Sequence, residues 1–286
     1  MPNLRDVKQR IRSVKNTQQM TKAMKLVSAS KLRKAQEAIQ TARPYAHKLR
    51  DVMNHLVARC NKDLHPLLDN RTGNRVLLLV VTADRGLCGG FNSNIFKMTQ
   101  ELIQENSDRD ISLFLAGKKG FDFFKNRPYK IEDKYLGWTK NFDYLKAIEI
   151  GEILANLFME NKTDRIYMVY NEFKSIIQQE VIREQLLPIV PEEAEDGDSL
   201  TDYIFEPDEE AILEDLLKRY MTTQVYRAFL ESSASEHGAR MTAMDAASRN
   251  AKEMIGKLTL FYNRTRQAYI TKELIEIVNG AEALKG

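Results

Sequence analysis

The stretch VLLLVVTADRGLCGGFNSNIF, residues 76–96, joins an unbroken apolar run to a glycine-rich turn and then to a helix-like pattern. An apolar run bounded by turn residues is typical of a strand that is buried on both faces. A strand, a tight turn and a helix in this order indicate one corner of an α/β domain. The same order also introduces many phosphate-binding sites, so the turn has two possible interpretations, a domain corner and a nucleotide site.

The glycine-rich turn matches neither common phosphate-binding template. A P-loop requires Lys and then Ser or Thr after its second glycine, whereas the glycines here are followed by Phe91 and Asn92. The dinucleotide fingerprint requires glycines at its first, third and sixth places, and with Gly86 as the first, the third is Cys88 and the sixth is Phe91. We therefore interpret the turn as a domain corner in which Asn92 or Ser93 caps the following helix, and a phosphate site remains the alternative.

The rest of the sequence contains no catalytic or metal-binding pattern. Cys60 and Cys88 form no CxxC pair and no zinc-ligand pattern, and the four histidines are scattered. We expect no catalytic residue, no cofactor and no metal ion, and we expect free thiols in a reducing compartment. If the turn binds no ligand, Asp84, Arg85 and Cys88 are expected to be exposed and to face a partner protein.

Charge is distributed unevenly along the 286 residues. The net charge is +3, but the first 60 residues hold 14 Lys and Arg against three Asp and Glu. A basic arm of this kind favours nucleic acid, a membrane surface or an acidic protein as a partner. A transit peptide is disfavoured because the regular pattern continues past residue 50. No apolar run approaches the roughly 18 residues that a membrane span requires.

Long helices are predicted at both ends of the chain. In residues 1–58, apolar or small residues recur every seven positions, which is the pattern of a left-handed coiled coil. Pro44 lies inside this run and is expected to bend the helix. Residues 208–286 contain no proline and carry a second heptad seam, from Leu230 to Tyr262. Each seam needs a partner, so we expect the two helices to pair antiparallel.

The middle of the chain, residues 75–206, alternates strand-like and helix-like segments. Such alternation predicts a mostly parallel sheet that is covered by helices, in a Rossmann-like α/β domain. The expected fold class is therefore α/β plus coiled coil. The predicted strands are Arg75–Thr82, Ile111–Ala116, Arg165–Tyr170, Val181–Leu187 and Asp202–Phe205. The predicted helices are Ser93–Glu105, Lys118–Lys125 and Phe142–Asn161.

The lengths of the two terminal helices predict their register. If Leu56 and Asp208 lie together at the α/β domain, opposed residues should have numbers that sum to about 264, within one heptad. About 25 residues from Leu260 onward then have no partner on the first helix. These residues are too apolar to stand in water, so we expect them to contact another protein and to fray in the isolated chain.

Three classes of function are compatible with such a shaft. An enzyme would need acid, base or nucleophile residues gathered in a cleft, and none are found. A nucleic-acid binder would use the basic helix, but Tyr45 is its single aromatic residue and no reader motif is present. A mechanical or scaffolding part of a larger assembly is favoured by apolar residues that face away from the seam. These residues are Met20, Ala23, Met24, Leu26 and Val27.

Three stretches of the sequence match one known family. They are NTQQMTKAMKLVSASKLRKAQ from Asn16, DRGLCGGFN from Asp84, and ITKELIEIVNGAEAL from Ile270. On these stretches the chain resembles the gamma subunit of bacterial F-type ATP synthase along essentially its whole length. A basic coiled-coil scaffold or a nucleic-acid-binding protein is the alternative.

The resemblance implies a rotor that is not itself catalytic. In the family, the paired helices run up the cavity of a ring of three alpha and three beta subunits, and the α/β domain and the epsilon subunit rest on the membrane c-ring. Proton flow turns this rotor, and the beta subunits change conformation in turn. The resemblance also implies a peripheral position on the cytoplasmic face of the bacterial inner membrane, with no nucleic acid bound. The implied partner contacts are Lys22, Met24, Lys25, Arg85, Cys88, Arg266, Gln267, Thr271, Glu273 and Glu276.

Overall fold

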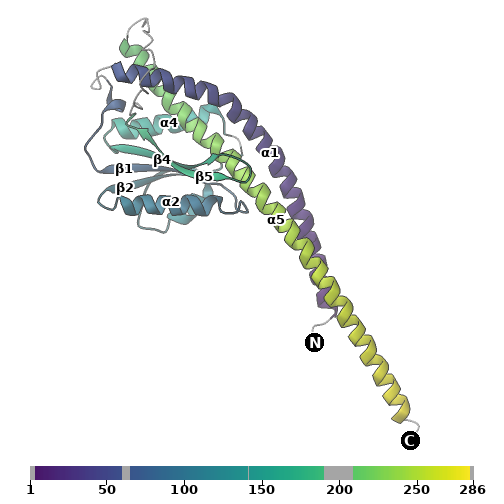
Figure 1. The fold of residues 1–286 in the computed structure, drawn as a ribbon. Coiled ribbons are helices and arrows are strands. Elements are labelled where there is room, and N and C mark those ends of the chain that lie inside the picture. Colours follow the sequence, from purple (N-terminus) through teal and green to yellow (C-terminus); the bar gives the residue numbers. More distant parts are fainter. Residues whose placement is uncertain (1–3, 60–64, 141, 190–208, 284–286) are drawn as a thin grey trace. The chain divides into compact units, whose positions relative to one another are not determined.

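The computed structural model describes residues 4–59, 65–140, 142–189 and 209–283. It consists of two units, one formed by residues 1–28 with 241–286 and the other by residues 29–240. The long helices α1 (Leu4–Arg59) and α5 (Glu209–Ala283) contribute residues to both units (Figure 1). Each unit is described by itself.

A five-stranded sheet forms the centre of the unit made by residues 29–240. The strand order is β3-β2-β1-β4-β5. The first four strands in the chain run parallel, and β5 pairs antiparallel with β4. This arrangement confirms the predicted mostly parallel sheet. The strands are β1 (Arg75–Val81), β2 (Asp110–Ala116), β3 (Lys130–Tyr135), β4 (Arg165–Phe173) and β5 (Gln179–Leu187).

Helices cover both faces of this sheet (Figure 1). Successive side chains of a strand point to opposite faces. Leu77 and Leu79 of β1 therefore pack in one core with α4 (Tyr144–Met159) and α5. Leu78 and Val80 pack in the other core, with α2 (Phe91–Glu105) and α3 (Lys118–Phe124). Burial on both faces explains why β1 is apolar at nearly every position.

One strand was not predicted. β3 has the sequence KIEDKY and lies at the edge of the sheet, where charged side chains are common and alternation of apolar residues is weak. The predicted strand Asp202–Phe205 lies outside the described residues. A short 3-10 helix, η2 (Pro66–Leu68), connects α1 to the sheet and buries Leu67 and Leu68 in the α4 and α5 core.

The terminal helices pair antiparallel in each unit. In the unit of residues 1–28 with 241–286, Lys25 Nζ lies 2.5 Å from Asp245 Oδ1. In the unit of residues 29–240, Arg43 Nη2 lies 2.9 Å from Glu231 Oε1, and Arg219 interacts electrostatically with Tyr45. The residue numbers sum to 270, 274 and 264. The first and last agree with the predicted register within one heptad, and the Arg43 pair lies outside it because the register was derived from helix ends rather than from side-chain contacts.

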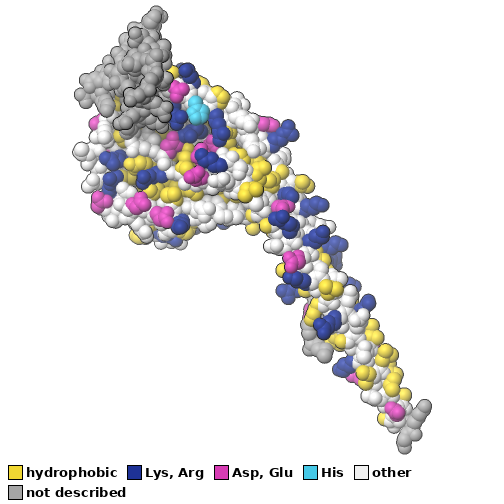
Figure 2. All heavy atoms as spheres, in the orientation of Figure 1, with side chains coloured by type: hydrophobic (Ala, Val, Ile, Leu, Met, Phe, Trp, Pro, Cys, Tyr) yellow, Lys and Arg dark blue, Asp and Glu magenta, His cyan; other side chains and the backbone are white. Residues whose placement is uncertain are grey.

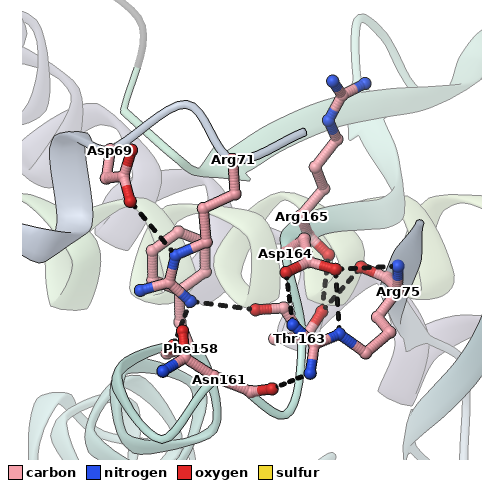
Figure 3. A network of polar contacts seen from close by, with 8 residues as sticks. All are labelled: Asp69, Arg71, Arg75, Phe158, Asn161, Thr163, Asp164 and Arg165. Atoms are coloured by element: carbon pink, nitrogen blue, oxygen red, sulfur yellow. Dashed lines mark hydrogen bonds and ion pairs between the residues drawn. The ribbon is translucent and has the colours of Figure 1, made fainter. Parts of the chain in front are cut away.

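A polar clasp joins the amino ends of β1 and β4 (Figure 3). The Asp164 carboxylate is buried and accepts hydrogen bonds from Arg75 N and Nε at 2.9 Å each and from Arg75 Nη2 at 2.7 Å. The Arg75 side chain lowers the pKa of Asp164 through these bonds. Arg71 donates to Phe158 O at 2.6 Å and stacks on the Phe158 ring. The clasp therefore fixes the segment before β1 to the turn between α4 and β4.

We expect Asp164→Asn to lower the free energy of unfolding by about 2 kcal/mol, because it removes the charge that pairs with Arg75 and places an amide donor at a buried position where the carboxylate accepted hydrogen bonds. Denaturant unfolding followed by the fluorescence of Trp138, the single tryptophan, measures this change. Asp69→Asn is the matched control, because its carboxylate is exposed and 3.4 Å from Arg71, and it should change stability by less than about 0.5 kcal/mol. If the two substitutions lowered the free energy of unfolding equally, the proposed contribution of the clasp to stability would be contradicted.

Candidate functional site

The glycine-rich turn after β1, residues 82–90, is shaped by two left-handed residues. Leu87 has φ 63° and Gly89 has φ 56°. The helix α2 then begins at Phe91, with Gly90 as its N-cap and no side-chain cap. The prediction that Asn92 or Ser93 caps this helix is therefore wrong. Asn92 instead turns back and its Oδ1 accepts a hydrogen bond from Ala83 N at 3.0 Å, which ties the turn to the end of β1.

Asp84 organises the carboxyl end of the sheet from inside this turn. Its Oδ1 accepts from Lys118 N at 3.0 Å and from Gly137 N at 2.9 Å, and its Oδ2 accepts from Thr139 N at 3.1 Å and Thr139 Oγ1 at 2.9 Å. These donors follow β2 and β3, so one carboxylate joins the loops at the ends of three strands. In nucleotide-binding α/β folds, donors at the carboxyl ends of the strands bind phosphate. Here they bind an aspartate, and the expectation that Asp84 is an exposed contact is corrected to that of a half-buried structural residue.

The turn also contacts α5. Arg240 Nη2 donates to Arg85 O and to Gly86 O at 3.3 Å each, and Arg240 Nε donates to Gly86 O at 3.4 Å. The other edge of the guanidinium lies 2.7 Å from Glu236 Oε1. Both side chains are almost fully buried. Burial raises the pKa of Glu236, and the positive charge of Arg240 opposes this shift.

His237 lies beside this pair and is also buried. Its Nδ1 is 3.4 Å from Arg240 Nη1. Burial, together with the charges of Arg240 and Lys31, lowers the pKa of His237 to about 4. The histidine is therefore neutral in the folded protein at physiological pH.

The outward side of the turn presents two side chains to solvent. Arg85 is exposed, as predicted, and Leu87 is 64% exposed. Cys88 was expected to be exposed, but it is buried in the α2 and α3 core, where Asn92 Nδ2 lies 3.2 Å from its sulfur. Burial also raises the pKa of the Cys88 thiol. The sequence analysis did not single out Leu87, although a leucine that directly follows a glycine in a tight turn is an available signal of an exposed apolar contact.

In the unit of residues 1–28 with 241–286, α1 carries an exposed apolar strip. Met20, Leu26 and Val27 are each more than half exposed. Met24 and Lys25 are half-buried, and Lys25 is paired with Asp245, whereas Lys22 is exposed. The outward apolar face that the sequence predicted is therefore present.

In the same unit, α5 continues past the start of α1 with its side chains exposed (Figures 1 and 2). The predicted contacts on this segment are all exposed: Arg266, Gln267, Thr271, Glu273 and Glu276. So are its large apolar residues: Leu260, Phe261, Tyr269, Ile270, Leu274, Ile275, Ile277 and Val278. Apolar residues clustered at this density on an isolated helix indicate a binding surface. We call residues 260–283 the apolar end of α5.

Comparison with known proteins places this chain in a family. A family model described as ATP synthase matches residues 3–284. The ATP synthase gamma chain of Geobacter metallireducens is 49% identical over 288 residues, and that of an Anaeromyxobacter species is 50% identical over 291 residues, each match covering 100% of both chains. The chain belongs to the family of ATP synthase gamma chains.

Solved structures of mitochondrial ATP synthases contain chains that have the same fold as this chain. A chain from the Tetrahymena thermophila central stalk and c-ring structure is 26% identical, with a TM-score of 0.62, over 80% of this chain and 99% of that chain. A chain from the Euglena gracilis OSCP/F1/c-ring structure is 22% identical, with a TM-score of 0.71, over 98% of this chain and 94% of that chain. Within the described residues, no helix is long and apolar enough to cross a membrane.

The environment of His237 predicts how stability depends on pH. The folded pKa lies near 4 and the unfolded pKa near 6.5, so the unfolded state binds a proton first and stability falls as pH drops from 6.5 towards 4. In the parent, this effect lowers the free energy of unfolding by up to roughly 3 kcal/mol between pH 6.5 and pH 4, and His237→Gln should remove it. The groups that face this histidine are Glu236 and Arg240 on α5 and Lys31 on α1.

Unfolding free energies at pH 7 and pH 4, followed by Trp138 fluorescence, measure the effect as a difference between variant and parent, so that other titrating groups cancel. His47→Gln is the control, because His47 is exposed on α1. If His237→Gln shows the same pH dependence as the parent, the buried neutral state of His237 is contradicted.

Proposed function

We propose that the chain is the central rotor shaft of an F-type ATP synthase, which couples rotation of the membrane c-ring to conformational changes at the catalytic beta subunits. The observation that carries this proposal is the apolar end of α5, whose large apolar side chains are exposed on a single helix. A surrounding protein ring would remove them from water. The gamma chains that are about half identical to this chain, and the rotor and central-stalk structures with its fold, support the proposal.

A shaft of this kind makes and breaks no covalent bonds. It transmits free energy because it contacts different conformations of its partner with different affinity. Reversing a two-state equilibrium from 1:99 to 99:1 requires a difference of about 5.5 kcal/mol. At about 25 cal/mol per Å² of apolar surface, this corresponds to about 220 Å² of contact that one conformation makes and the other lacks. The exposed leucine, isoleucine and aromatic side chains of the apolar end can supply an area of this size.

The basic and polar contacts are proposed to orient the shaft against its partners. Lys22 and Arg85 are exposed cations that suit an acidic segment of the beta subunits. Cys88 is buried, so we propose that it supports the turn and does not touch a partner. The remaining proposed contacts with the alpha and beta ring are Met24, Lys25, Arg266, Gln267, Thr271, Glu273 and Glu276.

The division of labour along the chain follows from these contacts. We propose that residues 1–58 and 208–286 form the shaft and that residues 75–206 form its base, which binds the epsilon subunit and the c-ring. The chain would then be held at the cytoplasmic face of the bacterial inner membrane through other subunits, as a non-catalytic and peripheral component.

We expect the double variant Leu274→Asp with Ile277→Asp to leave the folding of the isolated chain unchanged, because both side chains are already exposed. In the assembled complex, the same charges would have to be buried against the ring, which is costly. ATP-driven proton pumping by membrane vesicles that contain the complex should therefore fall at least about fivefold.

Asn279→Asp is the control, since it adds a charge at an exposed polar position of the same helix. Normal pumping by the double variant would show that the apolar end is not a working contact. Unfolding of the double variant in isolation would show that these side chains pack within the chain itself.

A further inference from the structure

Arg240 of α5 uses both edges of its guanidinium group, and one of them joins α5 to the turn after β1. One edge donates to the carbonyl oxygens of Arg85 and Gly86 at 3.3–3.4 Å, and the other edge contacts Glu236 one helical turn earlier. A guanidinium has its donors in a rigid plane, so fixing one edge fixes the direction of the other. Glu236 therefore sets the orientation in which Arg240 meets the two carbonyl groups.

The position of the Glu236 carboxylate is energetically unfavourable. Its side chain is 3% exposed, and its Oε2 has no hydrogen-bond partner in the part of the chain that the structure describes. Burial of a carboxylate with one unsatisfied oxygen is unfavourable, and such ion pairs are often no more stabilising than apolar residues of the same size. The presence of this ion pair is therefore better explained by the orientation that it gives the Arg240 guanidinium than by a contribution to stability.

The turn adopts a conformation that it would not favour by itself. Leu87 has φ 63°, a left-handed conformation that costs a residue with a side chain about 1–2 kcal/mol. Its side chain is nevertheless held 64% exposed, beside the exposed Arg85. The carbonyl groups that Arg240 binds belong to the two residues immediately before Leu87.

We propose that Glu236 and Arg240 are positioning residues that hold residues 85–87 in the conformation presented to a partner protein and make this turn move with α5 as one body. The proposal rests on the proposed function, because it assigns a mechanical connection within the rotor. Glu236 orients the guanidinium, the guanidinium holds the carbonyl groups of Arg85 and Gly86, and Arg85 and Leu87 are thereby presented outward.

Cys88 is the reporter for this connection. It is 2% exposed under the turn, so a maleimide reaches it only when the turn opens. Alkylation is measured on the full chain in a Cys60→Ser background. Arg240→Gln should raise the alkylation rate at least about tenfold, because it removes three charge-assisted hydrogen bonds to the turn. Electrostatics alone predicts the opposite, since Arg240 lowers the pKa of Cys88 and its loss would make the thiol less reactive.

Two further variants separate positioning from general stability. Arg240→Lys keeps a positive charge for Glu236 but cannot form the planar fork, so alkylation should still rise while the Trp138 fluorescence stays native. Glu236→Gln keeps an acceptor for Arg240 and should give a smaller rise. Arg249→Gln is the matched control, because Arg249 forms an exposed pair with Asp245 at the same spacing, and it should have no effect.

Unchanged Cys88 alkylation in both Arg240→Lys and Arg240→Gln, with native fluorescence, would overturn the proposal. A rise in Arg240→Gln alone would also overturn it, because charge and not the fork would then hold the turn. Since the assay needs no other subunit, its failure would leave the proposed rotor function untouched.

Discussion

The structure depends on one constraint, that a long amphipathic helix must bury its apolar side chains against something. In the unit of residues 29–240, α5 satisfies this constraint within the chain, because its residues from Leu213 to Ala239 pack on the sheet, on α4 and on α1. In the unit of residues 1–28 with 241–286, α1 covers only part of α5, and none of the described residues of this unit covers the large apolar side chains of the apolar end. The proposed function follows from this unsatisfied surface, because an assembly that surrounds the helix would complete its burial.

The α/β unit applies a familiar fold to a different purpose. Its central strand, glycine-rich turn and helix resemble the arrangement that binds phosphate in nucleotide enzymes. Here Asp84 of this turn binds donors in the loops after β2 and β3, and Arg240 ties the same turn to α5. The loops at the carboxyl ends of the strands, which form a ligand site in other proteins, are therefore hydrogen-bonded to one another here. The side chains of Arg85 and Leu87 are exposed at the outer surface of these loops.

Long-range features of this fold were predictable from the sequence because they rest on repeated patterns. The heptad seams and the apolar run of β1 predicted the coiled coil and the central strand, and the exposed strip around Leu26 followed from the same spacing. Features that depend on tertiary contacts were not predictable. β3 was missed because an edge strand can be charged, and Cys88 was misplaced because burial of a turn residue depends on which helix packs beneath it. The candidate contacts were predicted from family motifs and stay predictions, whereas the connection between Glu236 and Arg240 depends on how α5 packs on the turn, which no local pattern indicates.

The most direct test of this account is hydrogen exchange of the apolar end, compared between the isolated chain and the assembled complex. The account predicts that amides of residues 260–283 exchange rapidly in the isolated chain and become strongly protected in the complex, while amides around Phe229 are protected in both. Equal protection of residues 260–283 in the two states would contradict it, because the apolar end would then be stabilised without a surrounding partner.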